Sequence, residues 1–431
     1  MAAVQNRRAK VMTVLRVAGG NFLEMYDFMV FGYYASGIAR TYFPSESEFA
    51  SLMLSLMTFG AGFLMRPLGA ILLGAYVDHH GRRRGLLLTL GLMSVGTLGI
   101  AVTPGYASIG LAAPVLVVAG RLLQGFSAGV ELGGVSVYLA EIATSGRRGF
   151  YVSWQSASQQ VAVVFAAFLG VTLASALPPE QMADWGWRIP ILAGCLIIPV
   201  VFMLRRALAE TQEFLARRQH PTAREVLRSV AVNWRLVAIG LLMVTMTTVS
   251  FYMITAFTPT FGKSALNLAA TDNLLVTLCV GLSNLFWLPV MGTLADRLGR
   301  RPPLVFFAGL ALLTAYPAMA WLAGQPSFPR LLAVELWLSF LYAGYNGAMV
   351  VCLIEIMPPQ VRTAGFSMAY SLATAIFGGF TPAICSYLIH RTGNPAMPGL
   401  WLSFAALCGL AAAFALGRRP EAKPIAAEFP G

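Results

Sequence analysis

Four ionisable side chains stand inside long apolar stretches of the sequence. Glu24 and Asp27 are three residues apart, so both carboxylates lie on one face of a helix. Arg121 and Glu131 lie in a second apolar stretch. Charges are costly in hydrocarbon and, where they occur, they line ion or substrate pathways. The pattern therefore predicts that Arg121 interacts with one of these carboxylates inside the membrane.

The carboxylates differ in their expected roles. Asp27 is the first candidate for the proton site and Glu24 the second, while Glu131 is either a relay or a structural partner of Arg66. Two interpretations of Arg121 stay open. It either neutralises a carboxylate and locks two helices together, or it releases that carboxylate to a proton when it engages a substrate.

Neutral polar side chains could complete such a site, because amides and hydroxyls donate hydrogen bonds to carboxylates without a charge penalty. The candidates are Gln124, Gln155, Gln159, Tyr252, Tyr345, Asn346 and Ser371. For each of them a hydrogen bond to a neighbouring helix is the alternative. Glu335 falls near the end of an apolar stretch and is expected at the membrane interface.

The composition indicates what kind of protein must position these residues. Of 431 residues, 57% are apolar and only 11% are charged, against roughly a quarter charged in soluble domains. These values exclude a disordered chain, a disulfide scaffold and a typical cytosolic enzyme. The five cysteines lack metal-ligand spacing, so small buried apolar roles, no metal and no cofactor are expected.

Apolar stretches long enough to cross a membrane recur along the whole chain. Twelve are expected, over residues 13–38, 50–77, 86–103, 109–141, 150–176, 188–206, 235–260, 272–295, 303–323, 331–356, 364–390 and 399–417. The predicted fold is an all-α membrane protein with two six-helix halves, 1–206 and 235–417. A cytoplasmic linker, 207–234, joins them, and a cytoplasmic tail covers 418–431.

The basic residues are distributed unevenly between the two sides of this predicted bundle. Of the 30 Lys and Arg residues, 22 fall on the side of the N-terminus, five on the opposite side and three inside spans. Basic residues concentrate in cytoplasmic segments. Both termini are therefore expected in the cytoplasm, and the net charge of +12 needs no nucleic-acid partner.

Two loops repeat one pattern, which centres on Asp78 and Asp296. Residues 74–83 read GAYVDHHGRR and residues 292–301 read GTLADRLGRR. A Glu–Arg pair at a spacing of seven also occurs twice, as Glu141 with Arg148 and as Glu355 with Arg362. The separation between the two aspartates nearly equals that between the two glutamates. Nearly equal offsets predict a duplicated six-span unit.

The repeated loop resembles the signature of the major facilitator superfamily, although His79 stands where a more basic residue is usual. This resemblance implies that the loops latch the two halves together on the cytoplasmic side; simple topological anchoring is the alternative. The latch residues are Asp78, Arg82, Glu141, Arg148, Asp296, Arg300, Glu355 and Arg362.

Four further segments carry a narrower resemblance. Residues 21–28, NFLEMYDF, and 121–133, RLLQGFSAGVELG, are similar to the metabolite–proton symporter family. Residues 150–160, FYVSWQSASQQ, and 345–349, YNGAM, resemble bacterial citrate–proton symporters and their tricarballylate-carrying relatives. The resemblance implies a monomeric carrier in the bacterial inner membrane that imports a tricarboxylate with protons by alternating access.

Three other functions are alternatives to tricarboxylate uptake. A proton symporter for a dicarboxylate or a zwitterionic osmolyte would carry the same motifs in residues 21–28 and 121–133. A sensor without transport activity would be expected to carry a sizeable cytoplasmic domain, and the linker here is short. An enzyme is disfavoured, because the sequence has no Ser–His–acid order, metal-ligand cluster or phosphate-binding glycine loop.

Overall fold

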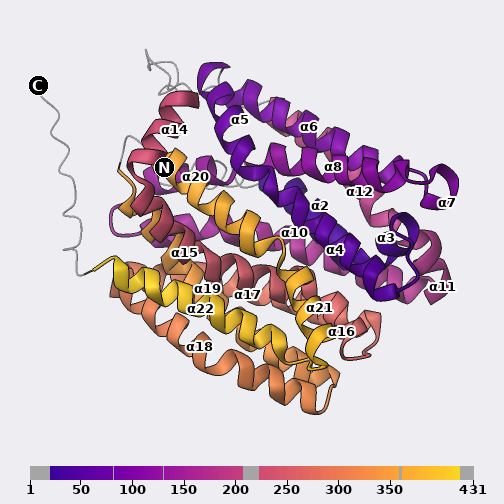
Figure 1. The fold of residues 1–431 in the computed structure, drawn as a ribbon. Coiled ribbons are helices and arrows are strands. Elements are labelled where there is room, and N and C mark those ends of the chain that lie inside the picture. Colours follow the sequence, from indigo (N-terminus) through magenta and orange to yellow (C-terminus); the bar gives the residue numbers. More distant parts are fainter. Residues whose placement is uncertain (1–19, 81, 130, 207–222, 359–361, 418–431) are drawn as a thin grey trace, which may run out of the picture.

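The computed structural model describes residues 20–80, 82–129, 131–206, 223–358 and 362–417, and these residues form a bundle of long helices (Figure 1). The N-terminal half contains α2 (Gly20–Tyr33), α3 (Ala35–Tyr42), α4 (Glu48–Leu64), α5 (Arg66–His80), α6 (Arg82–Val102), α7 (Tyr106–Ile109), α8 (Ala112–Ala128), α9 (Glu131–Glu141), α10 (Arg148–Ala176), α11 (Pro179–Gln181), the π-helix η1 (Met182–Gly186) and α12 (Arg188–Arg206).

The linker contributes α14 (Ala223–Val232). The C-terminal half contains α15 (Trp234–Tyr252), the π-helix η2 (Met253–Phe257), α16 (Thr258–Ser264), α17 (Ala270–Leu298), α18 (Arg301–Gly324), α19 (Phe328–Ile356), α20 (Arg362–Ala373), the π-helix η4 (Thr374–Gly378), α21 (Thr381–Thr392) and α22 (Met397–Ala415).

Ten helices in the described part of the chain are long and apolar enough to cross a membrane, and the bent pair 179–186 with 188–203 makes up to eleven. Helices α2 and α3 cover the described part of the first expected span, so the twelve-helix prediction fits. Helices form here because a backbone in hydrocarbon must satisfy its own hydrogen bonds. Most predicted boundaries agree with the helices to within about four residues.

Burial separates central helices from peripheral ones. In the apolar 18-residue stretch of α19, 89% of the residues are buried, and in the corresponding stretch of α18 only 33% are buried. Many large apolar side chains are exposed on the outside of the bundle, for example Leu196, Phe286 and Leu313. An apolar exterior on this scale suits a lipid environment.

The two halves contact each other along α10 and α17, with further contacts of α2 with η2, of α4 with α21 and of α5 with α20. We name the end that carries α14 the inner end and the end with α3, α7 and α11 the outer end, following the predicted sidedness (Figure 1). At the inner end, the backbones of Gly149 and Gly292 meet. At the outer end, Phe49 stacks on His390 with ring centres 3.7 Å apart. The halves therefore touch at both ends.

Glycines allow close packing within the N-terminal half, as their four-residue spacing predicts. A Cβ on Gly125 would collide with the carbonyl group of Gly62, and one on Gly129 with the carbonyl of Arg66. Helix α8 thereby lies directly against α4 and α5, which brings Arg121 toward the residues of α2.

Candidate functional site

Arg121 is completely buried in α8. Its guanidinium carbon lies 4.3 Å from the ring centre of Phe28 and 4.5 Å from that of Phe31, and cation–π attraction offsets part of its lost hydration. Its Nη1 donates a hydrogen bond to Gln124 Oε1 at 2.8 Å. Its Nε and Nη2 have no hydrogen-bond partner among the described residues. A buried cation with two open donors is suited to hold an anionic group.

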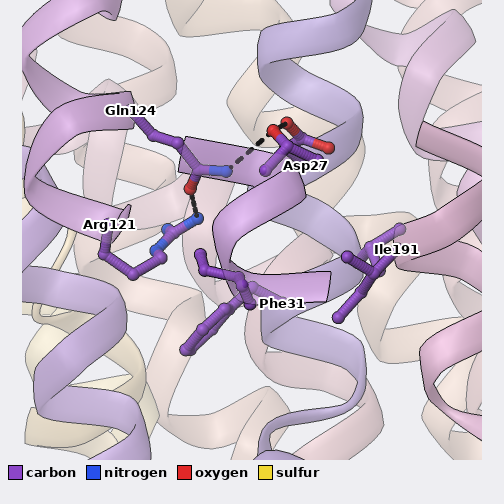
Figure 2. A pocket seen from close by; sticks show the side chains of 8 residues that line it. Asp27, Phe31, Arg121, Gln124 and Ile191 are labelled. Atoms are coloured by element: carbon purple, nitrogen blue, oxygen red, sulfur yellow. Dashed lines mark hydrogen bonds between the residues drawn. The ribbon is translucent and has the colours of Figure 1, made fainter. Parts of the chain in front are cut away.

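A short hydrogen-bond chain joins Arg121 to Asp27. Gln124 Nε2 donates to Thr97 Oγ1 at 3.0 Å, and the Thr97 hydroxyl donates to Asp27 Oδ2. Figure 2 shows Gln124 between Arg121 and Asp27. The sequence suggested a direct Arg121–carboxylate contact, and the structure instead places two neutral side chains between them. Thr97 of α6 was missed, because one threonine in an apolar stretch carries no distinctive sequence signal.

A small cavity adjoins this chain within the N-terminal half. Its volume is about 10 Å³, enough for roughly one water molecule. It is lined by Asp27, Val30, Phe31, Thr97, Ile100, Arg121, Gln124 and Ile191. Arg121 and Asp27, the two ends of the hydrogen-bond chain, both line this cavity.

A second buried charge pair lies beside the first. Arg66 Nη2 is 2.8 Å from Glu24 Oε1, and both side chains are almost fully buried. The guanidinium of Arg66 also lies 4.5 Å from the ring centre of Phe63. Helix α2 thus presents Glu24 directly to the start of α5. The pairing of Arg66 with Glu131 stays a prediction. The side chain of Glu131 lies outside the described part of the structure.

A second small cavity lies between the two halves. The N-terminal half contributes Met25, Arg66 and Gln159 to its wall. The C-terminal half contributes Thr248, Phe251, Tyr252 and Tyr370. Two of the residues predicted to bind substrate, Gln159 and Tyr252, line this cavity. Arg66, which is predicted to be structural, lines it as well and stays paired with Glu24.

The other predicted substrate residues do not line either cavity. Tyr345 donates its hydroxyl hydrogen bond to the carbonyl of Met243 at 3.1 Å, which is the helix-bonding alternative. Gln155 and Asn346 are buried, and Gln155 Nε2 and both amide atoms of Asn346 have no partner among the described residues. Ser371 is buried on α20, next to the cavity residue Tyr370.

Three of the predicted latch residues meet at the inner end. Arg300 Nη1 is 2.8 Å from Asp296 Oδ1, and its Nη2 is 3.0 Å from Glu355 Oε1. Burial opposes the charge of Arg300, but its bonds to Glu355 and Asp296 outweigh this and raise the pKa of the guanidinium. Glu355 thus pairs with Arg300 rather than with Arg362, whose Nε has no partner among the described residues.

Asp296 also joins the two halves. Its carboxylate accepts the backbone N–H groups of Gly149 and Phe150 at 2.7 and 2.9 Å. These groups belong to the first turn of α10, where backbone donors lack partners within the helix. Arg148 and Glu141 are exposed next to this contact, and the side chains of Asp78 and Arg82 lie outside the described part of the structure.

Comparison with known proteins decides the family. A family model described as the Major Facilitator Superfamily matches residues 17–382. The chain belongs to the Major Facilitator Superfamily. It is therefore a multi-pass transporter of the inner membrane and not an enzyme. The fold agrees with a solved structure of the xylose transporter XylE from E. coli in a partially occluded inward open conformation, with a TM-score of 0.73, 19% identity and coverage of 93% of this chain and 95% of that chain.

Two curated relatives in this superfamily cover nearly the whole chain. A citrate–proton symporter of Klebsiella pneumoniae is 60% identical over 411 residues, which are 95% of this chain and 93% of the relative. An alpha-ketoglutarate permease of Escherichia coli (strain K12) is 32% identical over 375 residues, which are 86% of each protein. These relatives confirm the resemblance that the sequence motifs indicated.

Proposed function

We propose that this chain imports citrate together with protons by alternating access, and that tricarballylate is a second substrate. The 60%-identical citrate–proton symporter supports the substrate and the coupling ion. One structural observation carries the proposal. Arg121 is buried with two open donors, and Gln124 and Thr97 link it to the carboxylate of Asp27.

Arg121 binds a carboxylate of the substrate through its open Nε and Nη2 groups. An Arg–carboxylate pair with two parallel hydrogen bonds is among the strongest polar contacts in proteins. The incoming negative charge repels that of Asp27, so binding favours the uptake of a proton by Asp27. Thr97 and Gln124 make the two events interdependent, because both groups share one hydrogen-bond chain.

The cavity between the halves supplies the remaining contacts. Arg66 offers a second cation, and its partner Glu24 is a second carboxylate that takes up a proton when Arg66 turns to the substrate. Gln159 and Tyr252 reach the same space from opposite halves and donate neutral hydrogen bonds. Both cavities are far too small for citrate here, so binding requires the halves to separate at one end.

Proton coupling has a clear energetic purpose. Citrate carries about three negative charges at neutral pH, and moving three charges inward against 100 mV costs about 7 kcal/mol. Protons taken up with the substrate offset these charges. The rocking of two repeat-related halves about a central site then exposes it to each side in turn.

The latch belongs to the same cycle. Asp296 holds the first turn of α10 while the inner end is closed. We infer that these bonds break when the carrier opens inward and that Arg300 and Glu355 then keep Asp296 oriented for closure. The repeated copy at Asp78 and Arg82 is proposed to serve the other half in the same way.

Uptake by the purified protein in liposomes tests the proposal. An inward proton gradient should drive uptake of labelled citrate, and a proton ionophore should abolish it. Unlabelled tricarballylate should compete, while succinate and betaine should not. Competition mainly by succinate or another dicarboxylate would support the alternative represented by the alpha-ketoglutarate permease, and competition by betaine would support an osmolyte carrier.

A further inference from the structure

A buried carboxylate in the C-terminal half has no place in the scheme above. Glu335 lies in α19, and only 3% of its surface is exposed. Its position at the membrane interface stays a prediction, and its side chain is enclosed by protein. Its Oε1 accepts a hydrogen bond from the Thr258 hydroxyl at 3.0 Å, and its Oε2 has no partner among the described residues.

No cation balances this carboxylate within the described part of the chain. The titratable side chains on the elements that contact α19 include Tyr151 on α10, Tyr252 on α15, Asp272 and Cys279 on α17, Tyr316 on α18 and Tyr370 on α20. Lys263 lies on α16, whose Thr258 bonds to Glu335. None of them forms an ion pair or a hydrogen bond with Glu335 in the described structure. An ionised Glu335 would be a buried charge without a partner, which costs several kcal/mol, and the neutral acid avoids this cost.

Thr258 places this carboxylate at a break in the helix that crosses the membrane between Trp234 and Ser264. It is the first residue of α16 and follows the π-helix η2, and such irregular turns are frequent at functional sites. Ala256 of η2 packs against Gly32 of α2 in the other half. The Glu335–Thr258 bond therefore ties α19 to the segment that closes the two halves against each other.

The internal repeat gives independent support. The separation between Arg121 and Glu335 in the sequence is the same as that between the repeated glutamates, Glu141 and Glu355. Glu335 thus occupies the position in the C-terminal half that the anion-binding arginine occupies in the N-terminal half. The duplicated unit has an ionisable side chain with an unused hydrogen-bonding group at this position in both copies.

A second polar connection between the halves begins one helical turn along α19. Ser339 Oγ donates to Asn284 Oδ1 at 2.8 Å, and Asn284 Nδ2 donates to Gln160 Oε1 at 3.2 Å. Gln160 belongs to α10 of the other half. Glu335 therefore lies one helical turn from a polar chain that reaches the other half.

We propose that Glu335 is a proton-binding carboxylate of the C-terminal half, and that the outer ends of the two halves close only when it is neutral. Opening of the outer end admits water to the carboxylate and allows it to ionise. Closure then requires a proton from the outer solution. The inference rests on the proposed proton-coupled uptake, to which it adds a second, outward-facing proton step.

The first test is the infrared spectrum of the purified full-length protein, titrated from about pH 5 to about pH 9 without substrate. We expect a protonated-carboxyl band that Glu335→Gln removes. Thr258→Val should keep the band and raise its frequency, because the hydroxyl donor to Oε1 is lost. Glu48→Gln is the matched control, since Glu48 is a highly exposed carboxylate paired with Arg40, and it should leave the band unchanged.

The second test is citrate uptake at different external pH values in liposomes. Wild-type uptake should fall as the external pH rises, because fewer carriers hold a neutral Glu335. Glu335→Gln should weaken that fall by about threefold or more, while Glu48→Gln should show the wild-type profile.

An unchanged band and an unchanged pH profile in Glu335→Gln would overturn the proposal. If Glu335→Gln does not fold, a Thr258→Val protein with an unshifted band would overturn it instead. The infrared result does not depend on the substrate. Absence of citrate uptake by the wild type would therefore refute the proposed function, while the band would still test whether Glu335 is neutral in the closed protein.

Discussion

The N-terminal and C-terminal halves share an architecture but bury different chemistry. The N-terminal half buries two carboxylates and two guanidinium groups, namely Glu24, Asp27, Arg66 and Arg121. In the described C-terminal half, Glu335 is the one buried side chain of the Asp, Glu, Lys and Arg types. To the cavity between the halves, the C-terminal half contributes the hydroxyl groups of Thr248, Tyr252 and Tyr370 and the ring of Phe251.

We infer that the two duplicated halves kept the same helices and the same loop pattern, while their buried side chains diverged. The repeated loop pattern survives near Asp78 and near Asp296. In contrast, the counterpart of Arg121 is Glu335, and the counterpart of Arg66, at the offset of the two repeated aspartates, is Asn284. We infer that anion binding and the main proton step belong to the N-terminal half, and the C-terminal half supplies neutral contacts and closure.

The largest expected effect is at Arg121. Arg121→Lys should lower citrate uptake in liposomes by about 100-fold or more, because an ammonium group lacks the planar pair of donors that fits a carboxylate. Arg40→Lys, at an exposed arginine, is the matched control and should transport normally. Near-normal uptake by Arg121→Lys would remove the arginine from the substrate site and weaken the contrast between the halves.

The second effect separates coupling from binding. Asp27→Asn should reduce proton-driven uptake by about 100-fold, because the proton site is lost. Exchange of external labelled citrate for internal unlabelled citrate needs no net proton movement, and it should persist within a few fold of wild type. Equal loss of both activities would show that Asp27 has a structural role instead.

A smaller effect is expected at the latch. Asp296→Asn should lower uptake by about tenfold, because charged acceptors hold backbone N–H groups and arginine more strongly than neutral ones. Spin labels at the exposed Arg148 and Arg297 positions should show longer distances in this variant. Asp272→Asn, at the other end of the same helix α17, should change neither measurement; if it matched Asp296→Asn, the effect would not be specific to the latch.

The smallest effect concerns packing in the N-terminal half. Gly125→Ala should destabilise the protein by about 1–3 kcal/mol, because its methyl group would meet the backbone of α4 at Gly62. Gly134→Ala should be nearly neutral, since no atom lies within 4 Å of the Cβ position there. The thermal unfolding midpoints of the two variants measure the difference, and equal midpoints would contradict the close packing.

Much of the fold could be predicted because apolar length and loop charge are local signals. The buried Arg121, Asp27 and Glu24 could be predicted as well, since charges within apolar stretches are conspicuous. The side chains that pair with these buried charges could not be predicted. Their pairing depends on how each helix is rotated and on the backbone contact of α8 with α4 and α5. The contact of Arg66 with Glu24 is such a case.

Residues without a distinctive local signal were the hardest to predict. Thr97 links Gln124 to Asp27, yet in the sequence it resembles many other hydroxyl residues in apolar stretches. Glu335 was expected at the interface from its distance to the end of the helix, and neighbouring elements η2 and α16 bury it. Asp296 was identified by its repeated loop, but its bonds to α10 depend on the pairing of the halves.

The most direct measurement of the central claim is proton uptake by the purified protein when citrate binds, followed with a pH indicator in weak buffer. Wild-type protein should take up protons as citrate is added, because anion binding at Arg121 favours the neutral form of Asp27. Asp27→Asn should bind citrate with a reduced proton uptake. An identical proton uptake in wild type and Asp27→Asn would contradict the account.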